Sequence, residues 1–249
     1  MRSIIRLATA VALGLPIAGF AAEPNDYVHT PLVEYGEREI DFKMGTLRLK
    51  DEAVRESAAS LGFGYGVTQW WFTEAYLKFE SGTGVSSHYD AFEWENLFQL
   101  TEHNQYPVDI GFLTEIEIPR ERREEGYELA IGPLFQGDAG PIRWNANLLF
   151  ERVLRGRSDT PRVTELSYQL QAKYPLSDDF EVGAQAFGDL GQWNHFDPSN
   201  EQVHRVGPAI FGKLKLGGRE TIRYNAAWLF SASSAAPKSG FRLQAEYEF

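Results

Sequence analysis

The last nine residues of the chain read Phe241-Arg242-Leu243-Gln244-Ala245-Glu246-Tyr247-Glu248-Phe249. Apolar and aromatic side chains alternate with charged or polar ones up to the terminal phenylalanine. A period of two predicts a β-strand with one apolar face and one polar face. The same alternation recurs through most of the chain, so this stretch is the last of a series of strands.

The other end of the chain has the features of a secretory signal peptide. Residues 1–6 are short and basic, residues 7–20 are apolar, and Gly19-Phe20-Ala21 places small residues where a signal peptidase reads them. An apolar run of this length is too short to span a bilayer, which takes about 20 residues. The sequence therefore predicts a signal peptide over 1–21, with Ala22 as the alternative cleavage point, and one domain over 22–249. A buried N-terminal helix is the competing interpretation.

Composition excludes several classes of function. The formal net charge is -11 and would become -13 without Arg2 and Arg6, so the basic surface that binds nucleic acid is missing. The chain has no cysteine, so neither a disulfide nor thiolate chemistry is expected. Charged residues interrupt every window of about 19 residues, which argues against a transmembrane helix. No cofactor is implied by any motif.

The alternation divides the chain into about twelve strands separated by turn residues. An even number is expected when both termini lie on the periplasmic side of a bacterial membrane barrel. The first strand is the least regular, and ten or fourteen strands remain open as alternatives. The predicted strands cover residues 33–44, 57–67, 70–80, 89–100, 108–118, 127–135, 142–152, 162–174, 180–189, 203–216, 221–231 and 239–249.

The connections and the aromatic residues fit an all-β, antiparallel, up-and-down transmembrane barrel. We expect the connections 45–56, 81–88, 120–126, 153–161, 190–202 and 232–238 to be extracellular and the shorter turns between them to be periplasmic. Aromatic residues fall at predicted strand ends, as two girdles at the headgroup levels require. The periplasmic set is Trp70, Trp71, Tyr174, Phe180, Tyr247 and Phe249, and the outer set is Phe79, Tyr127, Phe150, Phe230 and Phe241. A soluble β-sandwich is the alternative.

A final alternating strand that ends on Phe249 resembles the outer-membrane β-barrels of Gram-negative bacteria. This resemblance implies the outer membrane as the location. It also implies that the barrel assembly machinery reads the C-terminal strand, and that outer-membrane lipid and lipopolysaccharide are neighbours. The segments 93–96, 98–100 and 204–208 are similar to a set of proteobacterial outer-membrane proteins without an assigned role. They resemble, more weakly, the transporter barrels of aromatic-compound degradation clusters, and no functional residue is carried over.

Charged residues within the strands are expected to face the lumen, because a cation on the lipid face costs about 2–4 kcal/mol at the bilayer midplane. Acidic residues concentrate on the third to sixth strands and basic ones on the tenth to twelfth, roughly across the barrel. The predicted lumen-lining residues are Glu74, Glu93, Glu95, Glu115, Glu117, Arg143, Arg205, Arg223 and Arg242. Opposed walls of charge would select among small polar solutes in a narrow pore.

The predicted function is therefore a narrow porin-like channel or small-solute transporter, and not an enzyme. Three alternatives remain. The charged groups could instead form a network that closes the barrel, which would leave it a structural role. The Glu93/Glu95 and Glu115/Glu117 pairs could bind a divalent cation, although alternation alone often places two glutamates in this way. Ser86 and His88 could form the nucleophile and base of a lipid hydrolase if both face lipid.

Overall fold

The structure is a computed structural model that describes residues 23–51, 53–155 and 162–249. The predicted signal peptide, residues 1–21, lies outside these ranges. Among the described residues, no helix is long and apolar enough to cross a membrane.

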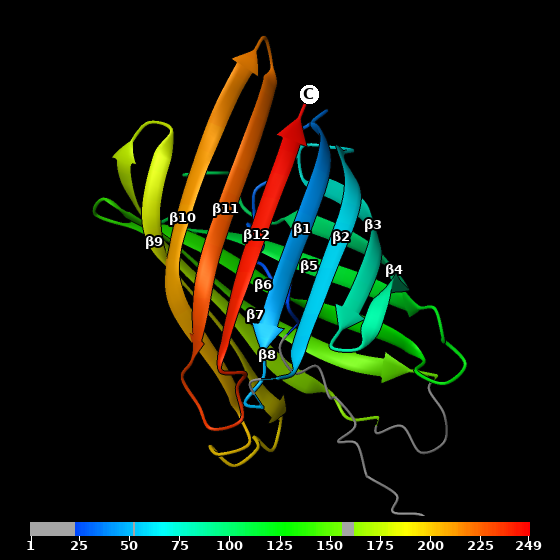
Figure 1. Ribbon diagram of the computed structural model, residues 1–249. Helices are drawn as coiled ribbons and strands as arrows, with labels where there is room; N and C mark the ends of the chain where they lie inside the picture. The colour runs from blue at the N-terminus through cyan, green and yellow to red at the C-terminus, as the bar shows by residue number, and fades with distance from the viewer. Residues whose placement is uncertain (1–22, 52, 156–161) are drawn as a thin grey trace, which may run out of the picture.

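The described chain forms a closed barrel of twelve strands (Figure 1). Each strand pairs antiparallel with its neighbour in sequence, and β12 pairs with β1 to close the ring. The prediction of an all-β antiparallel barrel with about twelve strands is thus confirmed. The strands are β1 (Arg38–Arg48), β2 (Arg55–Gly66), β3 (Trp71–Gly82), β4 (Val85–Gln99), β5 (Val108–Pro119), β6 (Tyr127–Ala139), β7 (Ile142–Leu154), β8 (Glu165–Ser177), β9 (Phe180–Gln192), β10 (Val203–Gly217), β11 (Glu220–Ser231) and β12 (Ser239–Glu248).

The closing pair joins the first strand to the last. The register runs without interruption from Glu39 opposite Glu248 to Arg48 opposite Ser239. A closed sheet leaves no unpaired edge, and this is the condition for a sheet to span a membrane. The alternating stretch at the C-terminus is therefore one of the two strands that complete the barrel.

Side chains on the two faces of the wall have the reverse of a soluble protein's arrangement. On β1, Ile40, Phe42 and Met44 are exposed on the outside, whereas Asp41 and Lys43 are buried inside. Apolar side chains remain exposed around the rest of the barrel as well, over far more surface than a water-soluble monomer exposes. A soluble sandwich would bury its apolar face, so this alternative is wrong.

The two ends of the barrel differ. At one end, here called the turn end, β1 begins, β12 finishes, and most connections are short; the opposite end is here called the loop end (Figure 1). Aromatic rings pair near both ends, for example Tyr247 with Phe249 at the turn end and Trp228 with Phe241 at the loop end. That the turn end faces the periplasm stays a prediction.

The first strand is the element whose predicted start is displaced furthest. Alternation predicts a strand from residue 33, but β1 begins at Arg38. Residues 33–37 instead lead out of the barrel interior, and Gly36 turns the chain with a φ of 79°. The weak alternation in this stretch reflects a segment that has no sheet neighbour.

Candidate functional site

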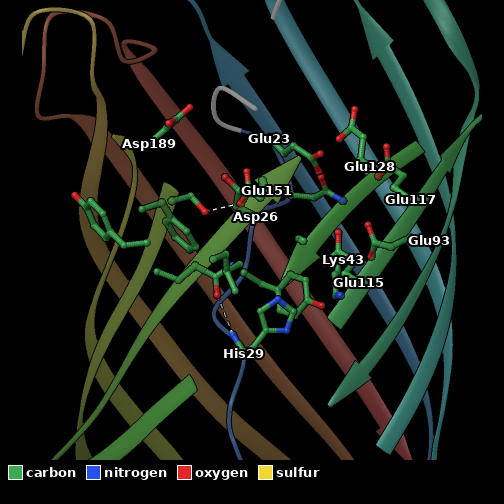
Figure 2. A pocket seen from close by; sticks show the side chains of 18 of the residues that line it. Glu23, Asp26, His29, Lys43, Glu93, Glu115, Glu117, Glu128, Glu151 and Asp189 are labelled. Carbon is green, nitrogen blue, oxygen red and sulfur yellow. Dashed lines mark hydrogen bonds between the residues drawn. The ribbon is translucent and has the colours of Figure 1, made fainter. Parts of the chain in front are cut away.

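An N-terminal segment occupies the barrel lumen. Residues 23–35, here called the lumen segment, run from the loop-end half of the lumen past Asp26 and His29 (Figure 2). They reach the turn end, where Gly36 precedes β1. Glu23 contacts Lys78 near the loop end, whereas the amide of Val33 donates to Gln99 at the turn end, with an N···O distance of 2.8 Å. The segment is therefore antiparallel to β1 and is enclosed by the wall.

Wall side chains supply hydrogen-bond partners that a sheet would otherwise provide. Buried backbone N–H and C=O groups require partners. The amide of His29 donates to Gln169 Oε1 at 3.3 Å, and Asn147 Nδ2 donates to the carbonyl oxygen of His29 at 3.0 Å. Asn25 Nδ2 donates to Ser60 Oγ at 3.3 Å. The polar inner face is thus used to hold a non-sheet backbone inside the barrel.

The lumen segment divides the interior into two cavities. The cavity toward the loop end has a volume of about 120 Å³, and the cavity toward the turn end has a volume of about 480 Å³. Tyr27 and His29 line both cavities and so mark the boundary between them. Eight carboxylates and three basic side chains line the loop-end cavity, and the turn-end cavity has the same numbers. Both compartments are therefore strongly acidic.

Lys78 lies among three carboxylates of the loop-end cavity. Its Nζ is 3.1 Å from Glu93 Oε2 and 3.0 Å from Glu23 Oε2, and it also contacts Glu117. The ammonium group is buried, so it requires several partners to offset the water it has lost. One of those carboxylates, Glu23, belongs to the lumen segment and joins the segment to the wall.

Lys43 lies at mid-height, between two tyrosine rings. Its Nζ is 3.2 Å from the ring centre of Tyr27 and 3.6 Å from that of Tyr76, an arrangement that stabilises a cation. Asp41 and Glu95 lie 3.4 Å and 3.6 Å from the same nitrogen. The hydroxyl of Tyr27 donates to Glu95. The segment thus contacts the wall through both the ring and the hydroxyl of Tyr27.

A chain of amide side chains crosses the opposite wall at a similar level. Asn145 donates to Gln136, Gln171 to Asn145, and Gln185 to Gln171, each to a side chain of the neighbouring strand. Arg242 then donates to Gln185 Oε1 at 2.6 Å. All but Gln136 and Gln171 are no more than 2 % exposed. The middle of the lumen is therefore filled by hydrogen-bonded side chains.

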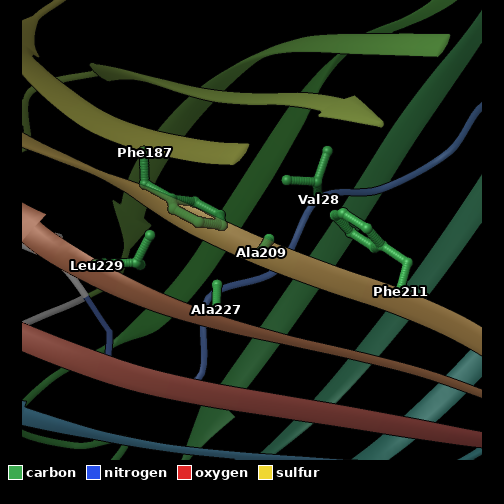
Figure 3. Close-up of a cluster of buried hydrophobic side chains, with 6 residues drawn as sticks. All are labelled: Val28, Phe187, Ala209, Phe211, Ala227 and Leu229. Atoms are coloured by element: carbon green, nitrogen blue, oxygen red, sulfur yellow. The ribbon is translucent and has the colours of Figure 1, made fainter. Parts of the chain in front are cut away.

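An apolar cluster anchors the centre of the lumen segment. Val28 packs with five buried residues of β9, β10 and β11 that face inward (Figure 3). These residues are Phe187, Ala209, Phe211, Ala227 and Leu229. On the polar side of the same contact, Arg205 forms an ion pair with Asp26 and donates to the carbonyl oxygen of Glu23 at 3.3 Å.

The nine predicted lumen residues separate into three groups in the structure. Glu93, Glu115, Glu117 and Arg205 line the loop-end cavity. Glu74, Glu95, Arg143 and Arg223 line the turn-end cavity. Arg242 is 2 % exposed and lies in the packed middle layer, where Gln185 accepts its hydrogen bond. That a solute meets these groups stays a prediction.

Sequence reasoning missed the residues that complete the site. Lys43 and Lys78 lie on the acidic side of the lumen, which the opposed-wall hypothesis treats as free of cations. Both lysines fall at the alternate positions of their strands that face inward, so the alternation of the sequence could have identified both as lumen residues. Tyr27 and His29 carry no such signal, because nothing local indicates that their segment lies inside the barrel.

Among the described residues, two groups of carboxylates are close enough to hold a metal ion, and one of them, Glu37, Glu39 and Glu248, lies at the turn end. The other involves the glutamate pairs that the sequence singled out. Ligand oxygens of Glu93, Glu95 and Glu115 all lie within 4.8 Å of one another. Lys78 already pairs with Glu93 and Lys43 with Glu95. Two of the three carboxylates therefore have an ammonium partner, and the group is explained without an ion.

The Ser86 and His88 pair does not have the geometry of a nucleophile and its base. His88 Nδ1 lies 3.2 Å from the backbone carbonyl oxygen of Ser86, which can only accept a hydrogen bond. Register shifts between β3 and β4 also place His88 opposite Glu80, whose parity matches the inward-facing Glu74 and Lys78. The expectation that both residues face lipid is therefore wrong for His88, because the register shift between Leu77 and Phe79 reverses the alternation that it assumed.

Solved structures of membrane channels have this fold, although sequence comparison finds no relative. No protein-family description and no curated protein matches the chain. The COG4313 outer membrane channel from Pseudomonas putida F1 is similar over 91% of this chain and 98% of that one, at 12% identity and a TM-score of 0.59. The KdgM porin, solved with disordered oligogalacturonate, matches over 85% and 99% at 10% identity and a TM-score of 0.53. The NanC porin matches over 84% and 98% at 12% identity and a TM-score of 0.53. This chain, with its barrel of twelve strands, shares the fold of these outer-membrane channels and porins.

Proposed function

We propose that this protein is a narrow porin-like channel of the Gram-negative outer membrane that passes small polar solutes. The observation that carries the proposal is a polar, charged interior with a cavity toward each end, inside a wall whose outer face is apolar. A polar lumen within an apolar belt is the arrangement that water-filled barrels use. The shared fold with channels and porins supports the same function.

The charges of the interior support a selective pore rather than a wide one. Arg205, Arg223 and Arg242 lie on β10 to β12. Six of the carboxylates that line the cavities lie on β3 to β6, and others lie on the lumen segment, β1, β7, β9 and β12. Opposed walls would impose a field across the pathway and favour solutes that carry charge or a strong dipole. Lys43 and Lys78 reduce the charge of the acidic wall without balancing it.

Single-channel recording in planar bilayers tests the proposal. We expect discrete conductance steps from the purified wild-type protein and an altered conductance in the Arg205→Ala/Arg242→Ala double variant, which removes two charges of the basic wall. The absence of conductance above background in both proteins would contradict the proposed channel function. Liposome swelling with cationic, neutral and anionic solutes of similar size would then identify the solute class.

A closed barrel with a structural role is the second candidate. The observation that favours it is the packed middle layer, where Tyr76, Lys43 and Arg242 are nearly inaccessible and the lumen segment separates the cavities. The same recordings discriminate the two functions, because a permanently closed barrel gives no conductance in either protein. A lipid hydrolase based on Ser86 has less support, given the position of His88.

Recognition of the C-terminal strand by the barrel assembly machinery belongs to the same proposal. Phe249 follows β12 directly, and its ring stacks on Tyr247 at a centroid distance of 5.4 Å. An exposed aromatic terminus on a lipid-facing strand is available for such recognition before the barrel closes. Outer-membrane lipid and lipopolysaccharide are the partners expected around the apolar belt.

A further inference from the structure

The barrel wall is shaped to receive the lumen segment. Three inward-facing glycines on three different strands lie against its backbone or its prolines. A Cβ added at Gly45 would overlap the carbonyl oxygen of Pro24, and one at Gly66 would overlap that of Glu34. A Cβ at Gly111 would lie 2.8 Å from Pro31 Cβ. Glycine within a strand often marks the close approach of another backbone, so the wall and the segment fit each other along the whole lumen.

The contacts between segment and wall are mainly of a kind that water can replace. They include the Asn25–Ser60 hydrogen bond, the Tyr27–Glu95 hydrogen bond and the ion pair of Arg205 with Asp26. When the segment withdraws, water that enters the lumen bonds to these groups, so the net cost is much smaller than the strength of the bonds themselves, although it is larger for the charged pairs than for the neutral one. Among residues 24–33, Val28 packs in a buried apolar cluster of the wall, and Pro31 is buried against Gly111. The segment is thus held specifically, but without the large apolar interface of a permanent core element.

Among the described residues, the lumen segment continues into the barrel wall at the turn end, through Gly36. The amide of Gly36 donates to the carbonyl oxygen of Gly66 at 2.8 Å, and the amide of Gly66 donates to that of Glu37 at 2.9 Å. These bonds fix the point at which the chain turns into β1. Gly36 has a φ of 79°, a conformation that glycine adopts without strain. Residues 23–35 can therefore leave the lumen through the turn end while β1 stays in the sheet.

We propose that the lumen segment is a reversible plug that closes the pathway between the two cavities and opens it by withdrawing about Gly36. The inference rests on the proposed channel function and adds the element that regulates it. In the closed state Tyr27 and His29 separate the cavities, and Tyr27 shares the Lys43 ammonium with Tyr76. Withdrawal removes Glu23 from Lys78 and Asp26 from Arg205, and joins the two acidic cavities.

A disulfide between the segment and the wall tests the plug in the full-length protein. The chain contains no cysteine, so Asn25→Cys with Ser60→Cys creates the one possible bridge. The side chains concerned are in contact, with 3.3 Å between Asn25 Nδ2 and Ser60 Oγ. We expect the oxidised variant to lose its openings and dithiothreitol to restore them, with each single variant unaffected by either treatment. A bridged protein, verified by mass spectrometry, that conducts like its reduced form would overturn the plug.

A substitution in the barrel wall, at one of the glycines that contact the lumen segment, provides an independent test that leaves the sequence of the segment unchanged. Gly45→Ala adds one methyl group against Pro24, and overpacking of this size is expected to raise the open-to-closed ratio about tenfold. Gly82→Ala is the matched control, because its Cβ would meet nothing closer than Arg55 O at 3.5 Å. Equal open times in the two variants would contradict the plug.

The results of these two experiments distinguish failure of the plug proposal from failure of the channel function. Conductance that neither the bridge nor Gly45→Ala alters would leave the channel function standing and reject the plug. Absence of conductance in every variant, including reduced protein and Gly45→Ala, would reject the channel function and the plug with it. Closure by the bridge together with longer openings in Gly45→Ala is the result expected from a plug.

Discussion

Lys43 is a buried cation whose removal takes the ammonium partner from two buried carboxylates. Asp41 and Glu95 lie within 3.6 Å of its nitrogen, and two tyrosine rings flank it. Breaking a buried ion pair by removing one partner typically costs about 3–5 kcal/mol. We expect Lys43→Met to lower the free energy of unfolding by about this amount, measured by urea titration with tryptophan fluorescence in lipid vesicles.

The control for this change is a lysine that forms an ion pair in water. Lys215 lies 3.1 Å from Asp179, and both side chains are at least half exposed. Exposed ion pairs contribute about 0–1 kcal/mol, so Lys215→Met should change stability little. Similar losses in the two variants would mean that burial does not determine the role of Lys43.

Glu37, which precedes β1, makes the stability of the folded protein depend on pH below neutrality. Burial raises the pKa of Glu37 from 4.5 to about 7; Glu248 adds to the increase, and Arg223 opposes it. Between these two pH values the folded protein keeps a proton that the unfolded chain has lost. The contribution of Glu37 to stability is therefore complete below pH 4.5 and is lost as pH rises to about 7.

The pH prediction is checked by comparing wild type with Glu37→Gln. Glutamine cannot ionise, so we expect the stability of Glu37→Gln to fall less steeply between pH 4.5 and 7 than that of wild type. Melting temperatures of the two proteins across this range provide the measurement. Parallel curves would show that Glu37 titrates alike in the folded and unfolded states.

At the scale of the strand, the alternation of the sequence maps directly onto the wall. The fifth predicted strand, residues 108–118, is observed as Val108–Pro119, and the seventh, 142–152, as Ile142–Leu154. These strands agree because a period of two follows from local backbone geometry. The first strand and the His88 region disagree, because a segment without a sheet neighbour and a pair of bulges leave little local trace.

Two residues on the lipid-facing side of β10 allow a matched test of how deep each part of the strand lies in the bilayer. Ile210 is 43% exposed in the middle of the strand, and Leu216 is 54% exposed at its turn end. Arginine on the lipid face costs about 2–4 kcal/mol at the bilayer midplane and about 0–1 kcal/mol near the interface. We expect Ile210→Arg to be much more destabilising than Leu216→Arg in vesicles, and equal losses would mean that the barrel does not span the bilayer at this level.

At the scale of the whole molecule, the interior has an excess of negative charge on both sides of the plug. Eight carboxylates face three basic groups in each cavity. A lumen of this charge concentrates cations and repels anions. We expect the reversal potential in a potassium chloride gradient to show a preference for potassium that weakens as ionic strength rises. A preference for chloride would mean that the basic wall on β10 to β12 controls permeation.

The sequence by itself determined most of the strands, a number near twelve and the face on which most charged residues lie. Each of these follows from a period of two and from turn residues, which act over a few neighbouring positions. Only the tertiary structure decided that residues 23–35 fill the lumen, because the contacts that hold them join residues far apart in the chain. Asp26 pairs with Arg205 and Tyr27 with Glu95, across separations of 179 and 68 residues. The same long-range packing decided that Lys43 and Lys78 moderate the acidic wall, and that the pathway is closed where Tyr27 and His29 lie.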